Sequence, residues 1–193
     1  MNRKLFLAHY AEGQRDFSHQ DLSKINLSDC TLNQANLSGT NLQAANLSGA
    51  HLQEADLSEA DLTAVNLSHA DLSQAILTGA ILTNANLSGA ILTEANLQQV
   101  QLAGANLSGA SLTTANLPQA VLTQANLSQA NLSGAVLSSA NLTEAVLHDA
   151  DLSWADLGMA NLTEADLTGA NMKMTIVIRT RFRNTIMPDG NQQ

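Results

Sequence analysis

The sequence predicts an all-β solenoid whose chain turns a corner every five residues. Leucine occupies every fifth position from Leu22 to Leu167 without interruption. Five α-helical steps of about 100° leave a side chain roughly 140° from its starting direction, so these leucines cannot share one helix face. Five is also odd, so successive leucines on a flat strand would point to opposite faces. A coil that bends once per five residues points every leucine inward.

The residues around each leucine support the same coil. Alanine stands two positions before almost every leucine, with Val65 and Val100 among the exceptions. Asn or Asp is the commonest residue directly before the leucine, and Ser or Thr mainly follows it. Each pentapeptide therefore has one large and one small apolar residue pointing inward. The small residue lets the backbone close tightly around the leucine column.

A second period sets the number of sides in a coil. Asn-Leu-Ser recurs every 20 residues from Asn26 to Asn126, whereas the other three pentapeptide positions are more mixed. Four pentapeptides therefore complete one coil, and residues i and i+20 stack. We expect the stacked asparagine amides to hydrogen-bond along the rod. The repeat runs from Asp16 to Met187, and at roughly 4.8 Å per coil it forms a rod about 40 Å long.

This A-(D/N)-L-x-x pattern resembles the pentapeptide-repeat family, and the resemblance covers nearly the whole chain. It implies a right-handed quadrilateral β-helix; the handedness follows from the resemblance alone. The segments Tyr10–Phe17 and Thr185–Gly190 are similar to those of cyanobacterial members, some of which regulate heterocyst differentiation through protein contacts. A leucine-rich repeat does not fit, because its leucines are unequally spaced.

The chain divides into three segments. Residues 1–14 form an N-terminal helical cap, with a short apolar helix over Lys4–Glu12 that stops at Gly13. Residues 15–187 form the repeat, and residues 188–193 form a C-terminal tail. Both ends of a solenoid expose unpaired backbone that must be covered. No second helix is expected, so either the tail or another subunit covers the C-terminal edge.

Charge is unevenly distributed along the chain. The formal net charge is −9, and no Lys or Arg occurs between Ile25 and Met172. An anionic body argues against direct binding of nucleic acid or an anionic membrane. A single cysteine, Cys30, and a poor signal peptide favour a cytoplasmic location. No apolar stretch approaches the roughly 20 residues of a membrane helix.

The sequence offers no constellation that supports catalysis. No two of the five histidines have the spacing of metal ligands, and the many serines lack a neighbouring base. Leucines fill the interior, so no deep pocket is expected. We therefore expect neither an enzyme nor a cofactor or metal site.

Apolar residues at outward positions are the first candidate partner surface. Most stand where the repeat calls for Asn or Asp, and they either pack against neighbouring coils or contact a partner protein. They are Ile76, Ile81, Ile91, Val121, Val136, Val146 and Trp154.

The last coil has an unusually apolar exterior, which makes it a candidate dimer end. The resemblance supplies a precedent, because some family members form dimers through their C-terminal coils. The apolar residues are Met174, Ile176, Ile178 and Ile186, and they lie beside Arg179, Arg181 and Arg183.

Two functions from different classes remain open. The favoured one is a non-enzymatic protein–protein interaction or scaffold protein that presents a rigid rod surface, with regulation as one use of it. The alternative, which the family resemblance suggests, is a DNA-mimicking inhibitor or protector of DNA gyrase. Its charges would be two acidic clusters: Glu54, Asp56, Glu59, Asp61 and Asp71, and Glu144, Asp149, Asp151, Asp156, Glu164 and Asp166.

Three observations count against the DNA mimic. The carboxylates are sparser than the phosphates of duplex DNA, which carries one charge per roughly 1.7 Å. No charged residue lies between Glu94 and Glu144. Family members that resemble gyrase inhibitors tend to have phenylalanine in the central column and loops that interrupt the repeat, whereas this chain has unbroken leucine from Leu22 to Leu167 and no insertion.

Overall fold

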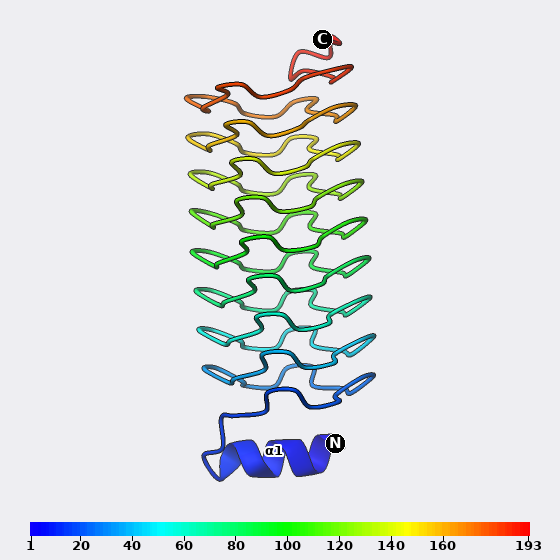
Figure 1. The fold of residues 1–193 in the computed structure, drawn as a ribbon, viewed down its shortest axis with the longest axis vertical. Helices are drawn as coiled ribbons and strands as arrows, with labels where there is room; N and C mark the ends of the chain where they lie inside the picture. The colour runs from blue at the N-terminus through cyan, green and yellow to red at the C-terminus, as the bar shows by residue number, and fades with distance from the viewer.

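The computed structural model describes all 193 residues and shows a rod of stacked coils with one helix across its N-terminal end (Figure 1). Each pentapeptide places the residue before its leucine in a parallel β-bridge with the residue 20 positions later. We name the four sides A to D in chain order. Side A carries Asp16, side B Asp21, side C Asn26 and side D Thr31, each with the residues stacked above it at intervals of 20. The predicted 20-residue coil is confirmed.

Backbone hydrogen bonds join neighbouring coils along the rod axis. In one pentapeptide, the N–H of Leu67 donates to the carbonyl of Asn86 at 2.7 Å, and the N–H of His69 donates to that of Ser88 at 2.9 Å. The N–H of Ala70 closes the corner by donating to Leu67 at 3.1 Å. Because this pattern repeats, the backbone polar groups are satisfied without long strands.

Almost every corner holds its residue in the left-handed backbone conformation. Glycine occupies some of these corners, but side chains such as those of Ala64 and His69 occupy most of them, with φ of 56° and 58°. At Gly89, lack of space for a side chain also favours glycine. A Cβ there would lie 2.6 Å from Nδ1 of His69, which covers this corner from the preceding coil.

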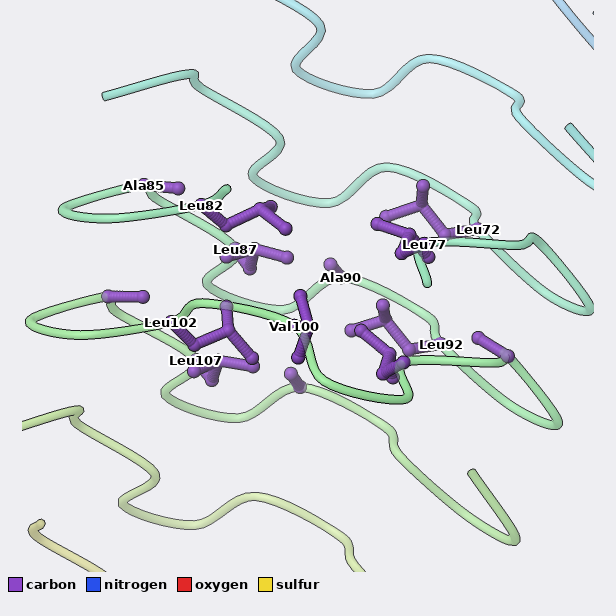
Figure 2. Close-up of a cluster of buried hydrophobic side chains, with 14 of the residues drawn as sticks. Leu72, Leu77, Leu82, Ala85, Leu87, Ala90, Leu92, Val100, Leu102 and Leu107 are labelled. Atoms are coloured by element: carbon purple, nitrogen blue, oxygen red, sulfur yellow. The ribbon is translucent and has the colours of Figure 1, made fainter. Parts of the chain in front are cut away.

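The core consists of the predicted leucine and alanine columns, and these residues are almost completely buried. Figure 2 shows Leu82 and Leu87 grouped in one half of the interior, with Leu72 and Leu77 in the other half. Leu102 continues the first group in the next coil. Each fully buried leucine contributes about 1.5–3 kcal/mol relative to an exposed one.

Side C carries the expected asparagine ladder. The Nδ2 of Asn66 donates to Oδ1 of Asn46 at 3.3 Å, and Asn86 donates to Asn66 at the same distance. Asn106 and Asn126 extend the ladder at 3.4 Å per step. The regular Asn-Leu-Ser register therefore has a structural role in holding coils together.

Helix α1 (Arg3–Ala11) covers the N-terminal end of the rod (Figure 1). It begins and ends one residue earlier than predicted. The side chain of Asn2 caps its start by accepting the N–H of Leu5 at 2.9 Å, and Glu12 is its C-cap. Phe6 is buried against Phe17, with ring centroids 4.2 Å apart. No helix in the structure is both long and apolar enough to cross a membrane.

Threonine replaces alanine in the inward column of the last coil. These hydroxyl groups donate to leucine carbonyls of the preceding coil at 2.6–2.8 Å. The donors are Thr175, Thr180 and Thr185, and the acceptors are Leu152, Leu157 and Leu162 respectively. The hydroxyls thus fasten a coil that has no further coil stacked on it.

The C-terminal tail covers only one side of the last coil. Ile186 pairs with Gln192 in an antiparallel bridge, and the N–H of Met187 donates to the carbonyl of Asn191 at 2.7 Å. The bridge lies on side C. The rest of the edge is open, and Val177 of the inward column is 41% exposed there.

A candidate protein-interaction surface at the C-terminal end

The rod has no internal cavity, and its surface has two shallow pockets. One lies on α1, beside Lys4 and Leu5, and the other on side A near the C-terminal end. No group of three or more His, Cys, Asp or Glu side chains comes together to hold a metal ion. The surface, rather than the interior, therefore holds the candidate functional residues.

The mid-rod residues predicted as a partner surface do not form one continuous patch. Ile76 and Val136 lie on side A, and Ile81 and Val121 on side B. The two others lie apart, Ile91 on side D and Val146 on side C. Polar residues separate them along each side, as Gln101 does between Ile81 and Val121. The isoleucines are about 40% exposed, and the valines are half-buried.

Apolar exposure is instead concentrated in the last two coils. Of the eleven large apolar side chains that are exposed, six fall between residues 154 and 178. Trp154 is 62% exposed and Ile178 is 69% exposed. We call five of the six the C-terminal apolar surface: Trp154, Met159, Met174, Ile176 and Ile178.

The 20-residue period brings these five side chains to one side of the rod. Trp154 and Met174 occupy the same corner in successive coils, and the N–H of Trp154 donates to the carbonyl of Lys173 at 3.0 Å. Met159 occupies the next corner, where its N–H donates to Ile178 at 2.9 Å. Side A runs between these two corners. The surface therefore covers side A and both of its edges.

Gly158 makes a groove within this surface. All the other stacked positions on side A carry a side chain: Ser18, Ser38, Ser58, Thr78, Gln98, Pro118, Ser138 and Ile178. The missing side chain leaves a shallow groove of about 330 Å³ lined by Met159, Ile176 and Ile178, with Asp156 and Arg179 at its rim. Gly158 is not in the left-handed conformation. Backbone geometry therefore does not require a glycine there.

Unpaired cations border the C-terminal apolar surface. Lys173, Arg179, Arg181 and Arg183 all lie in the last coil, and none of their side chains makes a hydrogen bond or ion pair with the rod. The single side-chain ion-pair geometry is that of His148 Nε2 and Asp166 Oδ2, 2.7 Å apart. The last coil thus combines exposed apolar groups with free positive charge.

The predicted acidic clusters form two bands around the rod rather than a stripe along it. Asp56, Asp61 and Asp71 of the first band lie on sides A, B and D. Asp156, Asp166 and Asp151 of the second lie on sides A, C and D. The glutamates of both bands and Asp149 occupy corners.

Several of these carboxylates accept hydrogen bonds from other residues of the rod. Burial raises the pKa of Asp71, but hydrogen bonds from the hydroxyl and N–H of Ser73 and from Gln53 outweigh it, so the pKa lies below its ordinary value. For Asp166, burial also raises the pKa, and hydrogen bonds from Thr168 and His148 lower it further than burial raises it. These charges stabilise the coil that carries them.

Sequence signatures of pentapeptide repeats match the chain in eight copies, over residues 16–49, 40–79, 80–119, 120–158 and 145–184. The chain belongs to the pentapeptide-repeat family. Pentapeptide-repeat proteins of known structure form right-handed quadrilateral β-helices, which is the fold predicted from the sequence.

Solved pentapeptide-repeat structures resemble the chain to different degrees. HetL of Nostoc sp. strain PCC 7120, a protein involved in heterocyst differentiation regulation, is 36% identical with 100% of both chains covered and a TM-score of 0.41. Rfr23 of Cyanothece 51142 is 38% identical over 48% of this chain and 63% of that chain, with a TM-score of 0.47.

QnrB1, a plasmid-mediated fluoroquinolone resistance protein, is 17% identical over 86% of this chain and 90% of that chain, with a TM-score of 0.51. At that identity the likeness shows the fold alone. No curated protein sequence matches the chain.

The structure joins two groups of residues that were predicted separately. Trp154, predicted with the mid-rod residues, shares side A and its corners with Met174, Ile176 and Ile178 of the predicted dimer end. Ile186 is not part of this surface, because it lies half-buried on side C against the tail. Sequence reasoning missed Gly158, although comparing positions 20 residues apart on side A would have revealed it.

Proposed function

We propose that this pentapeptide-repeat protein is a non-catalytic binding protein that recognises another protein through the C-terminal apolar surface. The observation that carries the proposal is the gathering of five exposed apolar side chains on one side of two adjacent coils. Contiguous exposed apolar patches of soluble proteins mark interaction sites more often than isolated apolar residues do. Trp and Met are also enriched in the buried centres of protein interfaces.

The rigidity of the rod supports this proposal. Every coil up to the last is bonded to its neighbours on both sides through the backbone, and the leucine columns leave the interior filled. A surface built on such a scaffold loses little conformational entropy when a partner binds. The same packing leaves no enclosed site in which a substrate could be separated from water.

We propose that the protein regulates its partner by binding to it. The relative HetL, which is similar over its whole length, is involved in the regulation of heterocyst differentiation. A protein without a catalytic site can regulate by occupying the surface of a target. The side chains available for this on the present chain are those of the last two coils.

The DNA-mimic function is the second candidate, favoured by the cation-free body of the rod between Ile25 and Met172. The two acidic bands give that body its negative potential, and a gyrase would meet them in place of DNA phosphates. The uncharged stretch between Glu94 and Glu144 separates the bands. We therefore rank this function below protein binding through the C-terminal apolar surface.

Affinity capture from native lysate at low and high salt tests the proposed function. The surface variant is Trp154→Ser/Ile178→Ser, and the matched control is Ile81→Ser/Ile91→Ser, which removes two exposed isoleucines outside the surface. We expect the surface variant to reduce capture of the partner about tenfold or more, because exposed aromatic and aliphatic anchors dominate interface energies. The control should capture normally.

Other outcomes of the capture experiment contradict the proposal. Equal capture by both variants would exclude the C-terminal apolar surface as the binding site. Topoisomerase subunits that are captured at low salt and released at high salt would favour the DNA mimic, since exposed charge–charge attraction is screened by salt.

We also propose a homodimer through the last coil as the alternative occupant of the C-terminal apolar surface. The open edge around Val177 and the adjoining apolar surface would be covered by a second copy. Light scattering at high protein concentration should then give a dimer mass for the native chain and a monomer mass for Ile178→Ser. A strictly monomeric native chain would rule out a stable homodimer.

A further inference from the structure

We infer that the partner binds through an acidic segment that inserts one large uncharged side chain into the Gly158 groove and pairs its carboxylates with Arg179, Arg181 and Arg183. This inference rests on the proposed function and specifies the chemistry of the partner. It follows from the shape of the groove, the charge around it and the direction in which the arginines lead away from it.

The groove is suited to a single apolar side chain. Its volume of about 330 Å³ lies over the bare backbone of Gly158, between Ser138 and Ile178 of the neighbouring coils. Met159, Ile176 and Ile178 give it apolar walls, and methionine adapts its shape to an inserted group. Apolar anchors that fill such pockets supply most of the energy of many interfaces.

The groove itself disfavours a negative charge. Oδ1 of Asp156 accepts the N–H of Gly158 at 2.8 Å, so its carboxylate is held at the rim of the groove. A second carboxylate placed there would be repelled. Met159, Ile176 and Ile178 also offer a charged group no hydrogen-bond partner inside the groove. The residue that enters the groove is therefore uncharged, and the acidic residues of the partner lie outside it.

The arginines define where those acidic residues lie. Arg179 stands at the rim of the groove, on the corner between sides A and B. Arg181 and Arg183 continue along side B of the same coil, on either side of Phe182. Each guanidinium lacks an intramolecular partner and can bind a carboxylate with two parallel hydrogen bonds.

The charges on the rest of the rod also favour binding of an acidic partner at the C-terminal end. The stretch between Ile25 and Met172 contains 13 acidic side chains and no Lys or Arg, and it precedes the four cations of the last coil. An acidic partner is repelled by that body and attracted by the last coil. The N-terminal end also carries four cations, but Glu12, Asp16 and Asp21 lie among them, whereas no Asp or Glu occurs between Asp166 and Asp189. Such a partner is therefore attracted most strongly to the last coil.

Fluorescence polarisation of labelled synthetic peptides tests the inference. The probe peptide has one phenylalanine followed by three glutamates at alternate positions, with serines between them. One control peptide replaces the phenylalanine by serine, and the other replaces the glutamates by lysines. We expect the probe to bind about tenfold or more tightly than either control, and its affinity to fall as salt rises.

Two variants of the protein measure the contributions of the groove and of the arginine charges to binding separately. Gly158→Ser narrows the groove by one hydroxymethyl group, which the chain already carries at Ser58 in an equivalent turn closed by Asp56. Arg179→Gln/Arg181→Gln/Arg183→Gln removes the charge. Each should weaken probe binding about tenfold. The control Lys4→Gln/Lys24→Gln removes two cations at the other end and should not change it.

Specific results would overturn the inference. Equal binding of the glutamate and lysine peptides, or unchanged probe binding by both Gly158→Ser and the triple arginine variant, would do so. Tighter binding of duplex DNA than of the probe would assign the arginines to nucleic acid instead.

The lysate experiment distinguishes the two proposals. If native capture depends on Trp154 and Ile178 but not on Gly158 or the arginines, the proposed function holds and the acidic-segment inference is wrong. If capture is independent of all of them, both are wrong.

Discussion

At the scale of single residues, the corners of the coil hold most of the local strain. A non-glycine residue in the left-handed conformation costs roughly 1–2 kcal/mol, because its Cβ approaches the following carbonyl. The chain tolerates side chains at these corners because the stacked coils on either side fix the backbone there.

Ala64→Gly should stabilise the rod. Ala64 has φ of 56°, so glycine relieves the steric cost while losing about 0.5–1 kcal/mol in chain entropy, for a net gain of about 0.5–1 kcal/mol. The thermal midpoint should rise by about 1–4 °C. Thermal unfolding followed by circular dichroism measures the change.

The matched control is Ala105→Gly, at a buried inward position outside the left-handed region. This variant gains no steric relief and should lower the midpoint. A midpoint that falls in both variants would show that the corner at Ala64 is not strained.

Acid should destabilise the rod through Asp71 and Asp166. The pKa of each is lowered in the folded state, so each stabilises the fold fully at pH values above the ordinary aspartate pKa of about 3.9. This stabilisation is lost as the pH falls through the lowered folded pKa.

Midpoints measured between about pH 2 and pH 6 should therefore drop most steeply below about pH 4. Asp71→Asn should drop less steeply than the native chain, since it keeps its neighbours but has no carboxylate to titrate. An identical acid profile for the two proteins would contradict this origin of the pH dependence.

Burial of individual residues could be predicted from the sequence, whereas corner conformation could not. Leu and Ala repeat with a fixed spacing, so their inward direction follows from geometry. Ala44, Glu54 and Gln74 have no preference for the left-handed region, yet the coil imposes it on all three. Local sequence carries no signal for a conformation that is set by the neighbouring coils.

At the scale of structural elements, the last coil depends on its threonine hydroxyls. The Oγ1 of Thr180 donates to the carbonyl of Leu157 at 2.7 Å, which also accepts the N–H of Ala160 at 2.9 Å. Thr180→Val removes the first bond without leaving the carbonyl unpaired. The expected loss is about 0.5–1.5 kcal/mol, confined to the last coil.

Amide hydrogen exchange measures this local effect. Exchange should accelerate at Ile176 and Arg181, whose N–H groups bond the last coil to the one before it, and stay unchanged near Leu107. Uniform acceleration along the rod would instead mean that the coils unfold as one cooperative unit.

The elements at the two ends were predictable to different degrees. The apolar run before Gly13 predicted α1 to within one residue at each end. The tail could not be predicted, because its pairing is antiparallel and occurs once. Repetition identifies the coils, and a segment that departs from the repeat has no second copy to indicate where it packs.

At the scale of the whole molecule, charge is segregated along the rod, with Lys and Arg confined to its two ends. Its body carries carboxylates and no cations, while its last coil carries four unpaired cations beside the C-terminal apolar surface. These features were visible separately in the sequence as apolar substitutions and as terminal arginines. Their convergence on side A depends on which residues stack 20 positions apart, and the groove depends on one missing side chain.

The central claim is that the C-terminal apolar surface is the binding site for another protein. Affinity capture that compares Trp154→Ser/Ile178→Ser with Ile81→Ser/Ile91→Ser tests it most directly, since both variants remove two exposed apolar side chains. The account predicts about a tenfold or greater loss of the captured partner with the first variant and no loss with the second. Equal capture by the two variants would contradict it.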